Sequence, residues 1–211
     1  MTSKPLRRLL LGLLAALASA SAWPGVQVYE PLAADVRAGL AASIADRSAP
    51  RHGFARSLEA VDWLDAMSQR LARRMPDFDS RLAFLKTLHY EATRAGLDPQ
   101  LVLAVVQVES GFKKYAVSSA GARGYMQVMP FWIKVIGTPA HNLFNFRTNL
   151  RYGCVILRHY LDIEKGDVSR ALGRYNGSLG KPEYPNLVLA TMKQAWAYDP
   201  ASRARTAEAA R

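Results

Sequence analysis

Apolar residues recur at every third or fourth position along most of this chain, the spacing that puts them on one face of a helix. No stretch longer than four residues alternates between apolar and polar as a half-buried strand would. The pattern therefore predicts an all-α fold, with short helices or irregular turns over residues 23–56. The longer predicted helices cover residues 57–75, 77 or 79 to 95, 98–111, 129–136, 148–165, 167 or 169 to 175, and 186–197.

One strongly apolar segment runs from Leu97 to Gly111. The side chain of Asp98 suits the cap of a first turn, and Pro99 suits the first helical position because its missing N–H needs no partner there. Gly111 can adopt the left-handed conformation that ends a helix. A run as short as Leu101–Val106 would also suit a buried strand, but these start and stop residues favour a helix that is buried on most sides.

Glu109 falls in the last turn of this predicted helix, where two physical effects act on its carboxyl group. Burial disfavours the charged form, and the negative end of the helix dipole disfavours it further. Both effects raise the pKa, and a carboxylic acid that keeps its proton near neutral pH can protonate a leaving group. The alternative is a surface glutamate at a frayed helix end. The apolar run before Glu109 favours burial and makes it the candidate catalytic acid.

The first 22 residues have the three parts of a secretory signal peptide. A basic start precedes the apolar segment Leu9–Ala18, and small residues suited to cleavage end at Ala22. The apolar segment is too short to span a bilayer, although an uncleaved anchor is the alternative. We expect a periplasmic or secreted protein with no stable membrane span after cleavage of residues 1–22.

The chain is basic, with 28 Lys and Arg against 17 acidic residues and a net charge of +11. Basic proteins often bind nucleic acid, but an exported one more readily meets an anionic cell-wall polymer. Between Ser110 and Leu161 there are seven Lys and Arg and no Asp or Glu. These cations can attract the carboxylates of such a polymer, and a solvated basic face without a partner is the alternative.

Cysteine and histidine usage limits other kinds of chemistry. The single Cys154 allows no intramolecular disulfide, and its apolar helical context predicts a buried small hydrophobic residue. The four histidines lack the spacing of metal ligands, and no phosphate-binding glycine loop is present in the sequence. We expect neither a metal nor a cofactor.

Several ordered motifs begin at Glu109. The chain reads Glu-Ser-Gly-Phe at residues 109–112, then Ser-Ser-Ala-Gly-Ala-Arg-Gly-Tyr-Met-Gln at 118–127, Met-Pro at 129–130, Asn-Leu-Arg-Tyr-Gly at 149–153, Arg-Tyr-Asn-Gly at 174–177 and Pro-Glu at 182–183. In this order and spacing the motifs resemble the catalytic domain of the soluble lytic murein transglycosylases (SLT), a branch of the lysozyme-like superfamily. Tyr125 departs from the family pattern, in which Leu is usual.

The resemblance implies a lysozyme-like helical domain over residues 81–198. An N-terminal helical extension over residues 23–80 precedes it, and a mobile tail over residues 199–211 follows. The implied enzyme cleaves the β-1,4 bond between N-acetylmuramic acid and N-acetylglucosamine in peptidoglycan without water. One Glu acts first as acid and then as base, and the muramic 6-hydroxyl closes on C1 to give a 1,6-anhydro product. Ordinary glycosidases need two carboxyl groups, whereas this scheme needs one.

The resemblance also assigns site residues. Glu109 is the acid and then the base, Ser110 helps to hold the site or merely caps the helix, and Gln127 hydrogen-bonds the sugar. The other assigned residues are Met129, which packs on a sugar face, Tyr175 and Asn176, which flank the catalytic Glu, and Glu183, which lines the glycan groove.

Glu183 is the least certain of these assignments on sequence grounds. Tyr184 stands where the family has Thr, and Leu187 stands where the family has Tyr. A solvated glutamate is therefore the alternative for Glu183, which is also a candidate for a second acid that reaches the site through space.

Other functions are open alongside the transglycosylase. A lysozyme-type hydrolase of the same fold would use water, and a catalytically weak glycan-binding component of a secretion apparatus would only bind. A basic nucleic-acid binder is disfavoured by the predicted signal peptide and the absence of a binding motif in the sequence. We expect a monomer that binds peptidoglycan strands and no nucleic acid.

Overall fold

The computed structural model describes residues 27–45 and 58–199 of the chain. In this part of the chain the secondary structure is helical, with isolated β-bridges but no strand, so the predicted all-α class is confirmed. The predicted signal peptide, and the predicted tail apart from residue 199, lie outside the described residues. The elements are α1 (Ala34–Ala45), α2 (Leu58–Leu71), α3 (Phe78–Arg94), α4 (Pro99–Ser110), α5 (Phe131–Ile136), α6 (Phe146–Ile163), α7 (Val168–Asn176), α8 (Glu183–Thr191) and the π-helical turn η2 (Met192–Trp196).

Aspartate side chains cap the start of three helices, and a left-handed glycine ends α4. Asp77 caps α3 by accepting a hydrogen bond from the backbone N–H of Ser80 at 2.8 Å. Asp98 caps α4 in the same way, and Asp167 caps α7. Gly111 ends α4 in the left-handed conformation, with a φ of 57°. The structure thus confirms both predicted ends of the α4 helix.

The last helix differs from its prediction. It begins at Glu183, before the predicted residue 186, and it widens into the η2 turn at its end. Tyr184 and Val188, four residues apart, form its buried face together with Trp196 of η2. Leu187 of the same helix does not belong to this face, because its side chain is 42% exposed.

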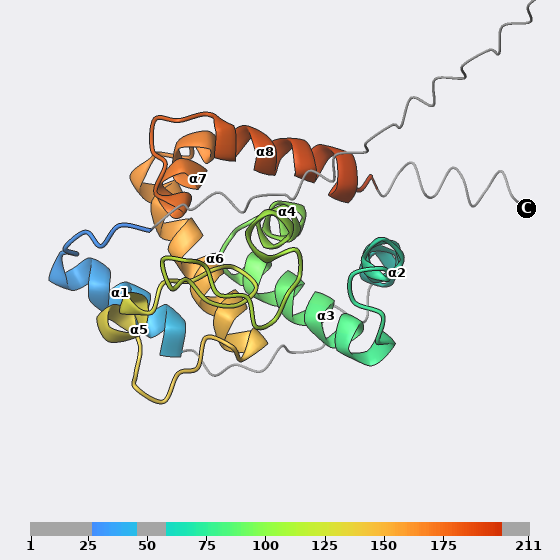
Figure 1. Cartoon of the computed structure of the whole chain (residues 1–211), viewed down its shortest axis with the longest axis horizontal. Coiled ribbons are helices and arrows are strands. Elements are labelled where there is room, and N and C mark those ends of the chain that lie inside the picture. Colours follow the sequence, from blue (N-terminus) through green and yellow to red (C-terminus); the bar gives the residue numbers. More distant parts are fainter. Residues whose placement is uncertain (1–26, 46–57, 200–211) are drawn as a thin grey trace, which may run out of the picture.

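Helix α4 lies at the centre of the fold (Figure 1). Every residue from Leu101 to Val106 is buried, and α4 packs against α3, α8 and η2. Figure 1 shows α4 almost end-on, between α8 above and α3 below. Burial on most sides, as the apolar run predicts, fixes the position of the last turn of α4 and of Glu109 within it.

The two helices before residue 80 join the same hydrophobic core. Helix α1 packs on α5 and α6, and α2 packs on α3 and η2. The Gln27 side-chain oxygen accepts a hydrogen bond from the Trp132 indole N–H at 3.0 Å. Cys154, on α6, is fully buried as predicted. Within the described residues, no helix combines the length and the apolar character that crossing a membrane requires.

Candidate active site

The carboxyl group of Glu109 is partly buried at the carboxyl end of α4, where it meets α8. The hydroxyl of Tyr184 donates a hydrogen bond to its Oε1 atom at 2.5 Å. Tyr184 is only 2% exposed, so the packing of α8 on α4 fixes this donor in place. The carboxyl group is therefore oriented by a neighbouring helix and does not extend into open solvent.

Burial raises the pKa of Glu109 from its ordinary value of 4.5 to about 7. The hydrogen bond from Tyr184 acts in the opposite direction, because it stabilises the charged carboxylate. No second carboxylate of the described residues contributes to the shift. The predicted upward direction is confirmed, and a pKa raised to about 7 allows Glu109 to carry a proton near neutral pH.

The backbone turns sharply directly after Glu109. Gly111 and Phe112 are both in the left-handed region, with φ values of 57° and 65°. This conformation is uncommon for a bulky residue, and the Phe112 ring is held by edge contacts with Phe84 and Trp196. Three aromatic rings therefore fix the turn that follows the candidate acid.

Ser110 ties the end of α4 to the loop that follows. Its buried hydroxyl lies 3.1 Å from the carbonyl oxygen of Val106, one turn back, and 2.8 Å from that of Tyr125 in the loop. These contacts hold the 111–130 loop against the helix that carries Glu109. They fit the predicted role of Ser110 in holding the site.

The side-chain nitrogen of Gln127 makes hydrogen bonds within the protein. The Nε2 atom donates to the carbonyl oxygens of Ala116 at 3.2 Å and Gly124 at 2.9 Å, and the residue has a φ of 48°. Both N–H groups are then used, so a hydrogen bond to substrate has to be accepted by the side-chain oxygen.

Asn149 is a site-building residue to which the sequence analysis assigned no role. It is fully buried on α6, and its Oδ1 accepts from the backbone N–H of Met126 at 2.7 Å. Its Nδ2 donates to the carbonyl oxygens of Arg123 at 2.8 Å and Leu143 at 2.9 Å. The motif at residues 149–153 includes Asn149, but only the fold shows which loops the Asn149 side chain joins.

The remaining predicted residues lie at different depths. Tyr175 is buried, donates to the Met126 carbonyl oxygen at 2.7 Å, and is close enough to Glu109 for that charge to raise the tyrosine pKa further. Asn176 is buried beside it at the end of α7, and Met129 is half-buried against the core. Glu183 is exposed in the first turn of α8, so its neighbour Tyr184 is the α8 residue that contacts Glu109.

A cavity of about 570 Å³ lies elsewhere, between α1, α6 and the end of α3. None of the predicted site residues lines it. Within the described residues, no group of three His, Cys, Asp or Glu side chains is placed to hold a metal ion.

Residues 86–184 match the Transglycosylase SLT domain family. The transglycosylase of Enterobacteria phage PRD1 is 35% identical over 49% of this chain and 38% of its own length. Membrane-bound lytic murein transglycosylase C of Edwardsiella ictaluri (strain 93-146) is 32% identical over 46% of this chain and 32% of the relative. The enzyme of the same name from Actinobacillus pleuropneumoniae serotype 5b (strain L20) is 47% identical over 22% of this chain and 13% of the relative.

This chain thus spans less than half the length of each of these relatives. No solved structure gives a significant match. The matched residues include Glu109, the loop that follows it, Tyr175 and Tyr184. Residues 86–184 of the chain therefore form a transglycosylase SLT domain.

Proposed function

We propose that this chain is a peptidoglycan lytic transglycosylase that cleaves the β-1,4 bond between N-acetylmuramic acid and N-acetylglucosamine. The observation that carries the proposal is the Glu109 carboxyl group, which is buried enough to keep a proton near neutral pH and is oriented by the Tyr184 hydroxyl. A proton donor of this kind is what cleavage of a glycosidic bond requires.

In the first step, protonated Glu109 gives its proton to the glycosidic oxygen. The bond from C1 to this oxygen breaks, N-acetylglucosamine leaves as an alcohol, and positive charge develops at C1. Glu109 becomes a carboxylate in this step. The Tyr184 hydroxyl then stabilises the new charge, because its hydrogen bond to Oε1 favours the ionised form.

In the second step, the Glu109 carboxylate removes the proton of the muramic 6-hydroxyl. The oxygen forms a bond to C1, which closes the 1,6-anhydro ring and restores the protonated acid. No water enters the product, and one carboxyl group serves both steps. The absence of acidic residues between Ser110 and Leu161, and of any second carboxylate acting on Glu109 in the described residues, supports a one-carboxyl scheme.

The proposed substrate is a polymer outside the cytoplasm, which fits the predicted signal peptide over residues 1–22. Two of the relatives are named as membrane-bound lytic murein transglycosylases. We therefore propose that the mature protein acts on peptidoglycan strands in the periplasm, as a monomer formed by the 23–80 extension and the 81–198 domain.

A lysozyme-type hydrolase is the second candidate, because the same protonated Glu109 would also start hydrolysis. In that case water would attack C1, and a second carboxylate would normally activate it. Glu183 was the candidate for that role, but its exposed side chain does not act on Glu109. The one-carboxyl site favours closure by the 6-hydroxyl.

The test compares the mature protein with its Glu109→Gln variant on purified sacculi. The amide keeps the shape of the side chain but cannot donate the proton, so we expect loss of muropeptide release with retained binding to sacculi. Mass analysis of the wild-type products distinguishes the candidates, because anhydro products lack the water that hydrolysis adds. Unchanged release by Glu109→Gln would refute the assignment of Glu109.

A further inference from the structure

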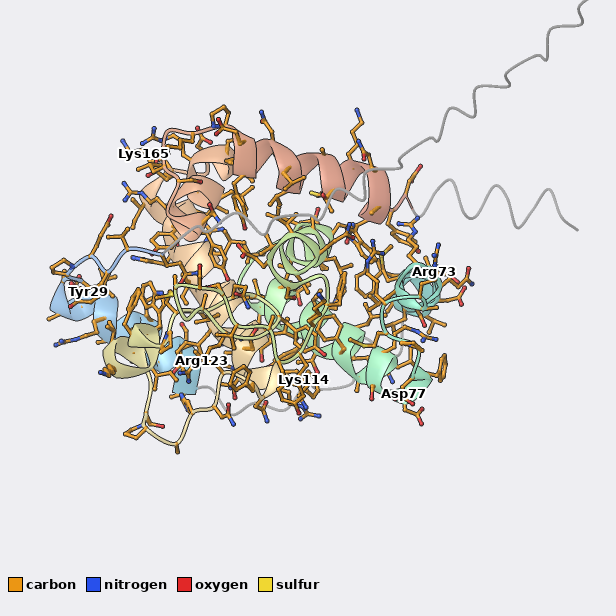
Figure 2. All side chains as sticks on the ribbon, viewed as in Figure 1. Tyr29, Arg73, Asp77, Lys114, Arg123 and Lys165 are labelled. Carbon is orange, nitrogen blue, oxygen red and sulfur yellow. The ribbon has the colours of Figure 1, made fainter. Side chains whose placement is uncertain are left out.

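The loops that follow α4 and α5 carry two aromatic rings and two cations, here called the aromatic–basic surface: Lys114, Tyr115, Arg123 and Phe144. Tyr115 is 69% exposed, and its ring centroid lies 5.9 Å from that of Phe144. The Lys114 ammonium lies 5.1 Å from the Tyr115 ring centroid, and the Arg123 guanidinium carbon lies 5.8 Å from that of Phe144. Figure 2 labels Lys114 and Arg123, which lie on the same side of the molecule, below α4 in this view.

Among the described residues, no acidic side chain pairs with the positive charges of this surface. The sequence has no acid between Ser110 and Leu161. Two cations of that stretch are paired by acids from outside or at its end, Arg151 by Glu91 and Arg158 by Asp162. Within the described residues, neither Lys114 nor Arg123 makes an ion pair. Both cations are exposed and available to an anionic partner.

Buried amides fix the loops that carry the surface. The Gln127 side chain donates to the carbonyl oxygens of Ala116 and Gly124, which directly follow Tyr115 and Arg123. The Asn149 side chain donates to the carbonyl oxygens of Arg123 itself and of Leu143, which precedes Phe144. The surface is therefore pre-organised, which lowers the entropic cost of binding.

The same loop connects this surface to the candidate acid. The hydroxyl of Ser110, the residue after Glu109, bonds to the Tyr125 carbonyl oxygen in this loop. The loop that follows the candidate acid therefore also supplies three of the four residues of the aromatic–basic surface.

We propose that the aromatic–basic surface binds the peptide-bearing glycan strand outside the cleaved bond. The exposed ring of Tyr115 and the partly buried ring of Phe144 suit the apolar C–H faces of sugar rings, and Lys114 and Arg123 suit the carboxylates of the attached peptides. The identity of the polymer rests on the proposed function. The proposal adds a second binding area, which holds the strand while Glu109 acts.

The experiment measures binding in the Glu109→Gln background, so that the polymer stays intact. The ligands are soluble glycan strands that keep their peptides, the same strands after removal of the peptides by an amidase, and a single-stranded oligonucleotide. The test variants are Lys114→Gln with Arg123→Gln, and Tyr115→Ala. The matched controls are Lys86→Gln with Lys193→Gln, which removes two other exposed charges, and Phe78→Ala, which removes another exposed ring.

We expect the Lys114→Gln, Arg123→Gln protein to bind peptide-bearing strands about fivefold more weakly, with a smaller loss on stripped strands and a reduced dependence on salt. Tyr115→Ala should weaken binding to both kinds of strand, and the control variants should bind like their parent. Circular dichroism verifies that each variant is folded.

Three outcomes would overturn the proposal. The first is unchanged binding to strands by the test variants. The second is an equal loss of binding in the control variants, which would mean that the loss does not depend on this surface. The third is a loss confined to the oligonucleotide, which would make the surface a nucleic-acid site. The proposed function is judged separately, because it depends on the products of the wild-type protein.

Discussion

At the scale of residues, the central pair is Glu109 and Tyr184. Burial raises the Glu109 pKa to about 7, and the hydrogen bond from Tyr184 counteracts part of this effect. The tyrosine therefore does two things, since it orients the acid and limits how strongly the acid retains its proton. An acid whose pKa lies near the working pH can both give and take a proton, which the proposed two-step reaction needs.

The first prediction concerns the dependence of the rate on pH. The acid must be protonated to start the reaction, and its folded pKa is about 7, so kcat/KM should fall as the pH rises through that value. The fall should approach about tenfold per pH unit on the alkaline side. The measurement is turbidity loss of sacculi against pH, with circular dichroism as the control for folding. A rate that stays constant up to about pH 9 would contradict the protonation state assigned to Glu109.

The second prediction concerns Tyr184→Phe, which removes the hydroxyl and keeps the ring. Because that hydrogen bond lowers the Glu109 pKa, its loss should shift the alkaline fall in rate to higher pH. The rate at neutral pH should drop about tenfold, because the carboxylate formed in the first step loses a donor. Leu187→Ala is the control, since this exposed side chain lies on the same helix. An unshifted pH profile in Tyr184→Phe would show that the hydroxyl does not act on the acid.

At the scale of elements, the loop between α4 and α5 is built around Gly124. Its φ is 74°, and an added Cβ would lie 2.5 Å from the Asn149 Nδ2 atom and 2.6 Å from the Leu143 carbonyl oxygen. The first contact would displace the buried amide that holds two loops together, and the second involves backbone that cannot move away alone. Glycine is therefore required here for space as well as for conformation.

The third prediction compares alanine at two glycines of this loop. Gly121 also has a positive φ, of 86°, but an added Cβ would meet nothing within 4 Å. Gly121→Ala should cost about 1 kcal/mol of stability from backbone strain alone, and Gly124→Ala about 3 kcal/mol or more. Urea denaturation measures both values. Equal losses for the two variants would show that the contacts with Asn149 and Leu143 are not tight.

At the scale of the whole molecule, Glu91 joins three helices. It is almost fully buried on α3 and makes ion pairs with Arg94 at 3.0 Å and with Arg151 of α6 at 2.8 Å. Arg94 in turn donates to the carbonyl oxygen of Ser43 on α1. This cluster connects the N-terminal extension to the domain, in addition to the shared hydrophobic core.

The fourth prediction follows from the burial of this cluster. Glu91→Gln removes the buried carboxylate that pairs with two partly buried arginines and should reduce the free energy of unfolding by about 3 kcal/mol. Asp162→Asn breaks the pair with Arg158 at a side chain that is 62% exposed, and should cost less than about 1 kcal/mol. Chemical denaturation of the two variants compares these losses, and similar values would contradict the structural role of Glu91.

Local chemistry explains what could be predicted from the sequence. Asp77, Asp98 and Asp167 cap helices through bonds to residues two or three positions away, so their effect is visible in a short window of sequence.

The predicted start of α8 is too late because Pro185 interrupts the apolar pattern of the helix. A proline in the first turn costs no helical hydrogen bond, and the helix can therefore begin at Glu183.

The features that sequence reasoning missed depend on contacts between distant segments. The Tyr184 hydroxyl meets Glu109 only because α8 packs on α4, and Asn149 bonds to carbonyl oxygens 6 and 26 residues away in two loops. The aromatic–basic surface likewise needs Tyr115 and Phe144 to be brought together by the fold. No local pattern encodes such pairs, whereas the motif around Glu109 lies within one helix and its following loop.

The central claim is that one carboxyl group cleaves the bond without water. The most direct measurement digests sacculi with the mature protein in water labelled with heavy oxygen and analyses the product masses. We expect 1,6-anhydro products that contain no label at the new end and are lighter than hydrolysis products by one water molecule. Labelled products that carry one heavy oxygen at the new reducing end, and that the Glu109→Gln variant does not form, would show hydrolysis. They would contradict the proposed closure by the 6-hydroxyl.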